Sequence, residues 1–142
     1  MNEQISKEVQ EVSELSSLLD RHGINPTAQR LEIARILFAR KQHLSADQVL
    51  GAINKGEVSV SKATVYNTLN LFADKGLVRQ VIVDPNRIFY DSNTDCHYHF
   101  YNQDTGELRD LDTSEVVIQG MPHVPADTYQ CGIDVIVHLK NR

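Results

Sequence analysis

The sequence contains little cysteine and no long apolar run. Its two cysteines, Cys96 and Cys131, are too few for a disulfide framework and would stay reduced in the cytoplasm. The longest apolar stretches, residues 81–83 and 133–139, are short or interrupted by charge or histidine, so we expect no membrane span. The acidic N-terminus also lacks the basic and apolar regions of a signal peptide. We therefore expect a cytoplasmic protein without a membrane partner.

Charge is distributed unevenly along the 142 residues. The formal net charge is −5, and 41% of the residues are hydrophobic, enough for one modest core or two small ones. Residues 21–87 hold ten Lys or Arg against five Asp or Glu, whereas residues 88–142 hold three against nine. This split indicates a part that faces phosphates joined to an acidic part that could hold cations. A chance distribution of solvated charges is the alternative.

The first half of the chain has helical periodicity. Residues 5–22 predict a helix that ends at Gly23, and Thr27 is placed to cap a second helix over residues 28–41. Ser45 and Gln48 have the spacing of a capping box at the start of a third helix. Three short helices are thus expected before residue 54.

A fourth helix, over residues 61–76, has an unusual polar face. Ser61 is placed to cap it and Gly76 to end it, while an apolar stripe occupies one side. The opposite side carries Ala63, Tyr66, Asn67 and Asn70. Asn can read base edges in a DNA major groove and an aromatic ring can meet a thymine methyl, although a solvated polar face is the simpler alternative.

The segment after this helix predicts a hairpin. Residues 77–91 alternate and turn at Asp84-Pro85-Asn86, with Arg79 and Arg87 on the two arms. A polar-faced helix followed by a basic hairpin is typical of a winged helix-turn-helix, in which the hairpin contacts phosphates. We expect this domain to span residues 1–88.

The remaining residues, 89–142, predict a second, smaller domain. Short strands are expected over residues 97–102, 107–112 and 129–139, with a helical turn near residues 113–120. Such a unit of about fifty residues is too small to be stable alone, so we expect self-association across a strand edge or sheet face. The predicted fold class is α+β, with a winged helix-turn-helix followed by a small α/β dimerisation domain.

A His-x-His pair in the second domain indicates a metal site. His97 and His99 share one face of a strand, while Cys96 is expected to point to the other face. If Asp104-Thr105 forms a two-residue loop, Asp110 faces His99 and Asp112 faces His97. Two imidazoles and a carboxylate favour Fe, Mn, Zn or Co, and the missing thiolates disfavour a structural zinc site. A polar strand face without a metal is the alternative, and the spacing leaves both carboxylates open.

Taken together, four ordered blocks resemble the ferric uptake regulator (Fur) superfamily of metal-responsive transcription regulators. They are "GINPTAQRLEIARIL", "HLSADQVL", "ATVYNTLNLFADKGLV" and "RIFYD" with the following "HYHF" and "TGELRDL". This resemblance implies a metal site on His43, Asp91, His97, His99 and Asp110. By themselves, His43 would be a surface histidine and Asp91 a turn cap.

The resemblance also implies the DNA-contacting residues. Tyr66 matches the base-contacting tyrosine of the family, and Asn67 lies beside it. With the flanking helix residues and the basic arms of the hairpin, the expected set is Lys62, Ala63, Thr64, Tyr66, Asn67, Arg79 and Arg87. Asn25 stands where the family often has a basic residue, so the resemblance does not extend to that minor-groove contact.

The two Cys-x-x-Cys pairs of many family members are missing. Asn102 and Thr105 occupy the positions of the first pair, and the tail has only Cys131, so we expect no structural zinc held by four cysteines. In this respect the chain resembles the iron response regulator (Irr) branch, which acts in iron and haem control. That branch often has three consecutive histidines where this chain has Cys96-His97 before Tyr98, which makes haem the less favoured ligand.

The resulting prediction is a homodimeric, metal-responsive transcription regulator of iron homeostasis, not an enzyme. One divalent ion per subunit would tie His43 to the acidic domain, fix a hinge near residues 88–91 and set the spacing of two recognition helices on a palindromic operator. One alternative is a winged-helix regulator whose metal site is vestigial or filled by haem. The other, a small His/Asp metalloenzyme, is disfavoured because the second domain leaves little room for an enclosed substrate pocket.

Overall fold

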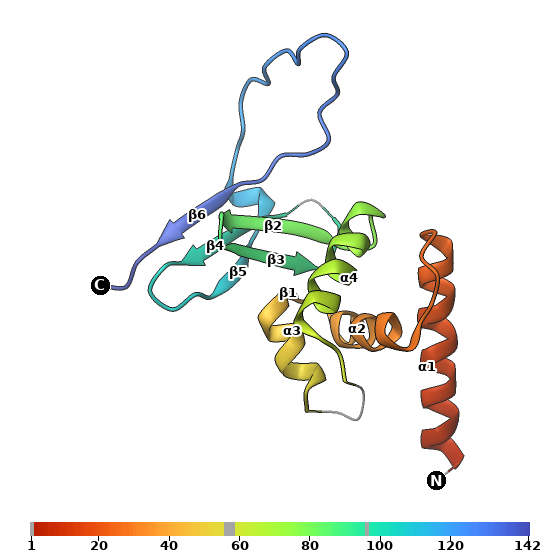
Figure 1. Cartoon of the computed structure of the whole chain (residues 1–142). Coiled ribbons are helices and arrows are strands. Elements are labelled where there is room, and N and C mark those ends of the chain that lie inside the picture. Colours follow the sequence, from red (N-terminus) through yellow and green to blue (C-terminus); the bar gives the residue numbers. More distant parts are fainter. Residues whose placement is uncertain (1, 56–58, 96) are drawn as a thin grey trace. The chain divides into compact units, whose positions relative to one another are not determined.

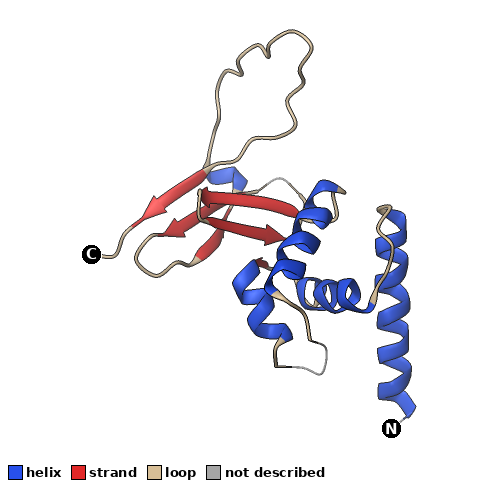
Figure 2. Cartoon of the chain, viewed as in Figure 1, coloured by secondary structure: helices blue, strands red, loops and turns tan. Residues whose placement is uncertain are grey.

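The chain folds into two compact units. The computed structural model describes residues 2–55, 59–95 and 97–142, and its units are Met1–Thr94 and Asp95–Arg142 (Figures 1 and 2). The sequence placed the division after residue 88 instead. The expected orientation of Cys96 falls on a residue outside the described ranges. Within those ranges, no helix has both the length and the apolar character needed to cross a bilayer.

Helices with well-defined ends make up most of the first unit. They are α1 (Asn2–Arg21), α2 (Ala28–Phe38), α3 (Ala46–Ile53) and α4 (Lys62–Asp74). Thr27, Ser45 and Ser61 each accept a hydrogen bond from a backbone N–H of the following turn, and Ser45 and Gln48 form the predicted capping box. The predicted helix starts are therefore confirmed, while α2 ends at Phe38 rather than at residue 41.

The buried faces of these helices form one apolar core. Val65, Leu69 and Phe72 of α4 are fully buried in it, which confirms the predicted stripe. Along α1, Leu19 is fully buried, whereas Val9 is 65% exposed. The C-terminal half of α1 is therefore the part that packs on the core.

A three-stranded antiparallel sheet completes the first unit. Its strands are β1 (His43–Ser45), β2 (Arg79–Asp84) and β3 (Arg87–Asp91), in the order β1-β3-β2. β2 and β3 are the two arms of the predicted hairpin, whereas β1 was not anticipated. The expected hinge near residues 88–91 is wrong, because these residues lie in the central strand, where residues 89–91 are paired on both sides and Ile88 is paired with β2.

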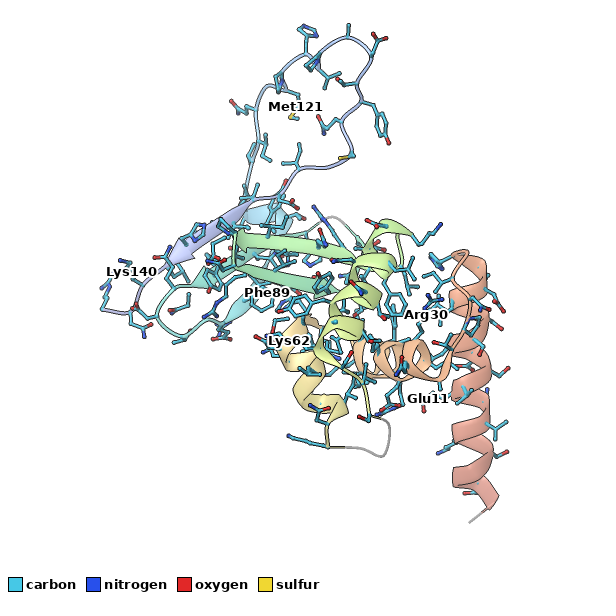
Figure 3. The ribbon with its side chains drawn as sticks, viewed as in Figure 1. Glu11, Arg30, Lys62, Phe89, Met121 and Lys140 are labelled. Carbon is cyan, nitrogen blue, oxygen red and sulfur yellow. The ribbon has the colours of Figure 1, made fainter. Side chains whose placement is uncertain are left out.

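The second unit is a smaller sheet. Its strands are β4 (Tyr98–Asn102), β5 (Leu108–Leu111) and β6 (Ile136–Leu139), in the order β5-β4-β6, with the 3₁₀ turn η1 (Thr113–Glu115) after β5. β5 is antiparallel to β4 and β6 is parallel to it. The last strand is shorter than the predicted 129–139, because residues 116–135 form a long excursion without regular structure, which includes Met121 (Figure 3).

The β4–β5 connection is longer than predicted. Asn102 and Glu107 close the hairpin through a 2.9 Å backbone hydrogen bond, so the loop has four residues rather than two. Asn102 Oδ1 accepts from the backbone of Asp104 and Thr105, and Asn102 Nδ2 donates to Asn141 Oδ1 at 2.8 Å. At the positions of the missing first cysteine pair, side-chain hydrogen bonds therefore hold the loop and attach it to the C-terminal segment.

Candidate metal centre and DNA-reading face

Two histidines and one aspartate converge in the second unit. His99 of β4 lies directly opposite Asp110 of β5, which confirms the predicted register although the loop length was wrong. Asp110 Oδ1 lies 3.4 Å from His97 Nε2 and 3.5 Å from His99 Nε2. One ligand atom from each of the three residues falls within a 4.8 Å span, a compact set of nitrogen and oxygen donors.

A hydrogen bond orients the first imidazole. His97 Nδ1 lies 2.7 Å from the carbonyl oxygen of Asp95, and a carbonyl can only accept, so Nδ1 carries the proton. The lone pair is then on Nε2, the atom nearest Asp110. Histidines that bind metals commonly donate their other N–H to a carbonyl or carboxylate in this way. The backbone of residue 95 therefore prepares His97 for a metal through Nε2.

The second carboxylate left open by the sequence has another role. Asp112 lies beyond β5 and caps η1, with Oδ1 accepting from the Ser114 backbone N–H at 2.9 Å. The hydrogen bonds from Ser114 hold the pKa of the Asp112 carboxyl below its ordinary value. The geometry thus assigns Asp110 to the histidine cluster and Asp112 to the capping of η1.

His43 and Asp91 are brought together in the first unit. They are cross-strand neighbours at the junction of β1 and β3, although 48 positions separate them in the sequence. The His43 ring packs edge-on against Phe89, with centroids 6.2 Å apart. Asp91 is only 1% exposed, and its Oδ1 accepts from the Asn93 backbone N–H at 2.9 Å. A buried carboxylate is costly unless it is hydrogen-bonded, paired with a charge or bound to a metal, which makes Asp91 a strong ligand candidate.

The five expected ligands have donor types that suit a small divalent cation. His43 and Asp91 belong to the first unit, and His97, His99 and Asp110 belong to the second. Three imidazoles and two carboxylates without a thiolate suit borderline ions such as Fe²⁺, Mn²⁺ or Zn²⁺. Haem fits this donor set less well than a divalent ion, because His97, His99 and Asp110 offer three donors within a 4.8 Å span.

Helix α4 exposes most of the predicted reading face. Ala63, Tyr66 and Asn67 are at the surface, and Thr64 is half-buried, with its Oγ1 accepting from Ser61 Oγ at 2.9 Å. Lys62 stands at the start of the helix (Figure 3), with Nζ 5.8 Å from the centre of the Tyr66 ring. The exposed side thus carries an aromatic ring, an amide and a cation within two turns.

Asn70 is the exception on this face. Its Oδ1 accepts hydrogen bonds from Tyr90 Oη at 2.8 Å and from Gln80 Nε2 at 3.2 Å. A paired contact with adenine needs both the oxygen and the nitrogen of the amide. Asn70 therefore holds α4 against the hairpin rather than reading a base. Burial raises the pKa of the Tyr90 phenol above its ordinary value, so the hydroxyl stays a donor at neutral pH.

The two hairpin arginines occupy different positions. Arg87 lies beside the turn and pairs in register with Asp84. Its side chain is exposed, as a contact with DNA phosphates requires. Arg79 is half-buried at the base of the hairpin and lies across from Asp91. It is therefore near the expected ligands of the first unit as well as the hairpin.

Two cavities of the first unit were not anticipated. One, of about 320 Å³, lies between the first turns of α2 and α4 and is lined by Thr27, Gln29, Arg30, Thr64, Asn67 and Thr68. It adjoins the reading face. Of the described residues that line it, Arg30 is the charged one, and a 2.8 Å hydrogen bond to the Asn25 carbonyl anchors its side chain. The sequence pattern alone did not indicate this groove, because it forms only when two helices meet.

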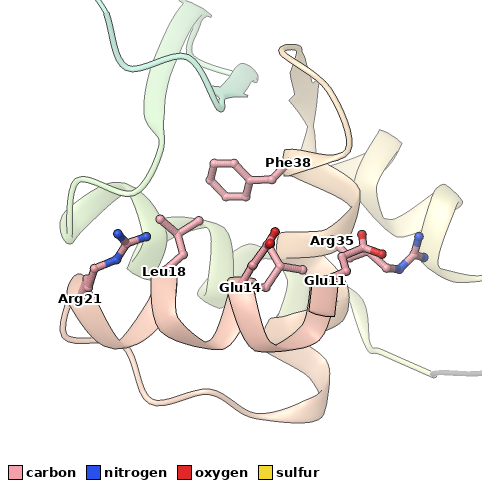
Figure 4. Close-up of a pocket in the computed structure, with 7 residues that line it drawn as sticks. Glu11, Glu14, Leu18, Arg21, Arg35 and Phe38 are labelled. Carbon is pink, nitrogen blue, oxygen red and sulfur yellow. The ribbon is translucent and has the colours of Figure 1, made fainter. Parts of the chain in front are cut away.

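The other cavity, of about 420 Å³, lies between α1 and α2 (Figure 4). Glu11, Glu14, Arg21 and Arg35 line it together with Leu15, Leu18 and Phe38. Arg35 is bound to Glu32 on the same helix, with Nε 3.1 Å from Oε2. Because its acidic and basic side chains balance, we assign no ligand to this cavity.

Comparison with known proteins gives one consistent result. The sequence pattern of the Ferric uptake regulator family matches residues 21–124. The peroxide-responsive repressor PerR of Staphylococcus aureus (strain Mu50 / ATCC 700699) is 32% identical over 111 residues, which cover 78% of this chain and 75% of the relative.

Solved structures have the same fold. The ferric uptake regulator of Pseudomonas aeruginosa with manganese has a TM-score of 0.67 at 24% identity, covering 89% of this chain and 97% of the other. The ferric uptake regulator of Francisella tularensis with iron has a TM-score of 0.68 at 19% identity, covering 84% and 93%. These likenesses confirm the predicted α+β fold class.

Proposed function

Because the chain belongs to the ferric uptake regulator family, we propose that it is a transcription repressor whose affinity for DNA depends on one divalent ion per subunit. The observation that carries this proposal is the convergence of His97 Nε2 and His99 Nε2 on one carboxylate oxygen of Asp110. The proposed ligands are His43, Asp91, His97, His99 and Asp110.

The family consists of metal-dependent transcription regulators, so the prediction that the chain is not an enzyme is confirmed. The metalloenzyme alternative is accordingly set aside. A regulator of transcription acts where the chromosome is, and we therefore propose a cytoplasmic location.

In the proposed mechanism, the protein supplies ligands from two parts of the chain. His97 and His99 would bind through Nε2, Asp110 and Asp91 through carboxylate oxygens, and His43 through its imidazole. The bound ion would supply a cross-link between elements that the sequence separates. We propose that this cross-link restricts the motion of these elements, so that DNA affinity rises through preorganisation rather than through new contacts.

We propose iron or manganese as the physiological ion. The nitrogen and oxygen donors support this choice, and family members of known structure include forms with manganese and with iron. We retain the regulation of iron homeostasis, as in the Irr branch, because both cysteine pairs are missing. A peroxide response is the second candidate, favoured by the name of the Staphylococcus aureus relatives. Haem is the less favoured ligand because it fits the donor set less well than a divalent ion does.

On the DNA side, we propose a homodimer that binds a palindromic operator. Tyr66 and Asn67 of α4 would contact base edges in the major groove, flanked by Lys62, Ala63 and Thr64, while Arg87 and Arg79 of the hairpin would serve the phosphates. The two recognition helices of a dimer must lie about 34 Å apart to enter successive major grooves. The net positive charge of residues 21–87 supports the proposal that this part of the chain contacts the DNA phosphates.

The experiment that tests this function measures operator binding with and without metal. Protein purified anaerobically is analysed for metal, and its affinity for its own promoter is measured in Mn(II), Fe(II), haemin or a chelator. Replacing both His97 and His99 by alanine should abolish the metal dependence. If the double variant kept the metal dependence of the wild type, the assignment would be wrong.

A matched pair of variants tests the choice of carboxylate. Asp110→Asn should lose metal-dependent binding, whereas Asp112→Asn should keep it, since asparagine can still cap η1. Brief treatment of the iron-loaded protein with hydrogen peroxide separates the two candidate signals. Loss of DNA binding under peroxide with retention in the Mn(II) form would favour the peroxide response over iron sensing.

A further inference from the structure

The hydrogen bonds of Asn70 connect the recognition helix to the strand that carries Asp91. Tyr90 lies in β3 directly before Asp91, and its hydroxyl donates to Asn70 Oδ1 of α4 at 2.8 Å across 20 positions of sequence. Gln80 of the neighbouring strand β2 donates to the same oxygen at 3.2 Å. Both lone pairs of this oxygen are thereby used, so α4 is held by two donors from two strands.

Strand geometry places Tyr90 and the next residue, Asp91, on opposite faces of β3. Tyr90 is 2% exposed and belongs to the helical core, and Ile88 packs against the same core. Asp91 and Phe89 lie on the other face, where the His43 ring packs against Phe89. A shift of the β3 backbone at this point must therefore move a proposed metal ligand and the partner of the recognition helix together.

We propose that Tyr90 and Asn70 are positioning residues that transmit metal occupancy from Asp91 to the DNA-reading face of α4. This inference rests on the proposed metal-dependent function. An ion bound by His43 and Asp91 fixes the end of β3 and, with it, the rigid phenol of Tyr90. The phenol in turn fixes the rotation of α4 about its axis, on which the direction of Tyr66 and Asn67 depends. Without the ion, the end of β3 would keep its pairing with β1 and β2 but lack this further restraint, and the reading face would be less well oriented.

Tyr90→Phe is the direct test, because it removes only the hydroxyl and keeps the packed ring. Operator affinity is measured in Mn(II) and in chelator, and the ratio of the two affinities is the readout. Loss of one neutral hydrogen bond should reduce this ratio roughly two- to tenfold. Mn(II) affinity, measured separately by competition with a chelating dye, should stay within about twofold of the wild type, since the hydroxyl is not a ligand.

Asn70→Ala and the double variant distinguish coupling from general damage. If the Tyr90 hydroxyl acts only through Asn70, the double variant should reduce the ratio no further than Asn70→Ala alone, which also loses the hydrogen bond from Gln80. Tyr129→Phe is the control for hydroxyl loss, because Tyr129 is 84% exposed on the second unit. It should leave the ratio unchanged. Should Tyr90→Phe fail to fold in thermal denaturation, Asn70→Ala, on the exposed face of α4, decides the test alone.

Two results would overturn the inference. One is an unchanged affinity ratio in both single variants. The other is an equal loss of affinity with and without Mn(II), which would make the contact merely structural. A wild-type protein whose DNA binding did not respond to Mn(II) or Fe(II) would instead contradict the proposed function, and this is established before any variant is measured.

Discussion

The two units of the protein are stabilised in different ways. Among the described residues, the first unit buries a continuous apolar core from all four helices, whereas the buried hydrophobic residues of the second unit are Tyr101, Leu108 and Leu111. The second unit also leaves Val117, Met121 and Tyr129 at least half exposed. We infer that the first unit is stable through its own packing, and that the second depends on a metal and on a second copy of the chain.

The largest effect should come from the core of the first unit. Phe72→Ala removes a fully buried ring from α4 and should lower the free energy of unfolding by about 3–5 kcal/mol. Urea denaturation followed by circular dichroism measures this loss. Val9→Ala, at a 65% exposed position of α1, is the control and should change stability little. A small effect of Phe72→Ala would show that this core is not what stabilises the first unit.

The second-largest effect should be the stabilisation of the second unit by metal. A ligand at 100 times its dissociation constant stabilises the folded state by about 2.7 kcal/mol. Hydrogen exchange should therefore show Mn(II)-dependent protection of β4 and β5, with little change in the core of α2. His99→Ala should remove this protection. Equal protection of both units, or protection that persists in the variant, would contradict the contrast between them.

Loss of a helix cap should have a smaller effect. Ser61→Ala removes the acceptor for the Thr64 backbone N–H and should cost about 1 kcal/mol. Ser61→Asp should restore most of this loss, because aspartate is an equally good cap. Thermal denaturation of the three proteins makes the comparison, and identical stabilities would show that the cap contributes nothing to α4.

The smallest effect should come from lowering the pH around the Asp112 cap of η1. The pKa of Asp112 is lowered in the folded state by hydrogen bonds from Ser114. The stability that it contributes is therefore present above the ordinary pKa of an aspartate, 3.8, and is lost as the pH falls through the lower pKa of the folded state. Hydrogen exchange at the Ser114 amide should accelerate relative to neighbouring amides in this range. Asp112→Asn should abolish the pH dependence. If the variant kept it, another group would be responsible.

Local signals in the sequence were sufficient for much of the first unit. Caps at Thr27, Ser45 and Ser61 act within one helical turn, and the apolar stripe of α4 follows from its period. The register that sets His99 against Asp110 was also predictable, because the alternation of a hairpin restricts which residues face each other. The actual loop of four residues keeps that register, so an error in loop length did not change the facing pair.

Such local signals do not predict which strands pair when they are far apart in the sequence. Strand β1 is three residues long and its pairing with β3 depends on residues 48 positions away, so only the resemblance to known regulators indicated His43 and Asp91. The polar face of α4 likewise suggested that Asn70 was a base reader. The residues that bind it, Tyr90 and Gln80, come from the two strands of the hairpin. No local sequence pattern predicts where the hairpin packs against the helix.

The sequence by itself determined the helices and the caps of three of them, the hairpin, the register of the histidine strand and the nitrogen and oxygen character of the site. These features depend on neighbours within a few residues. The tertiary structure decided which carboxylate joins the histidines, that His43 meets Asp91, and that Asn70 holds α4 to Tyr90. These outcomes depend on side chains that packing brings together. The free energy of packing comes from residues throughout the core, so no single segment of the sequence predicts it.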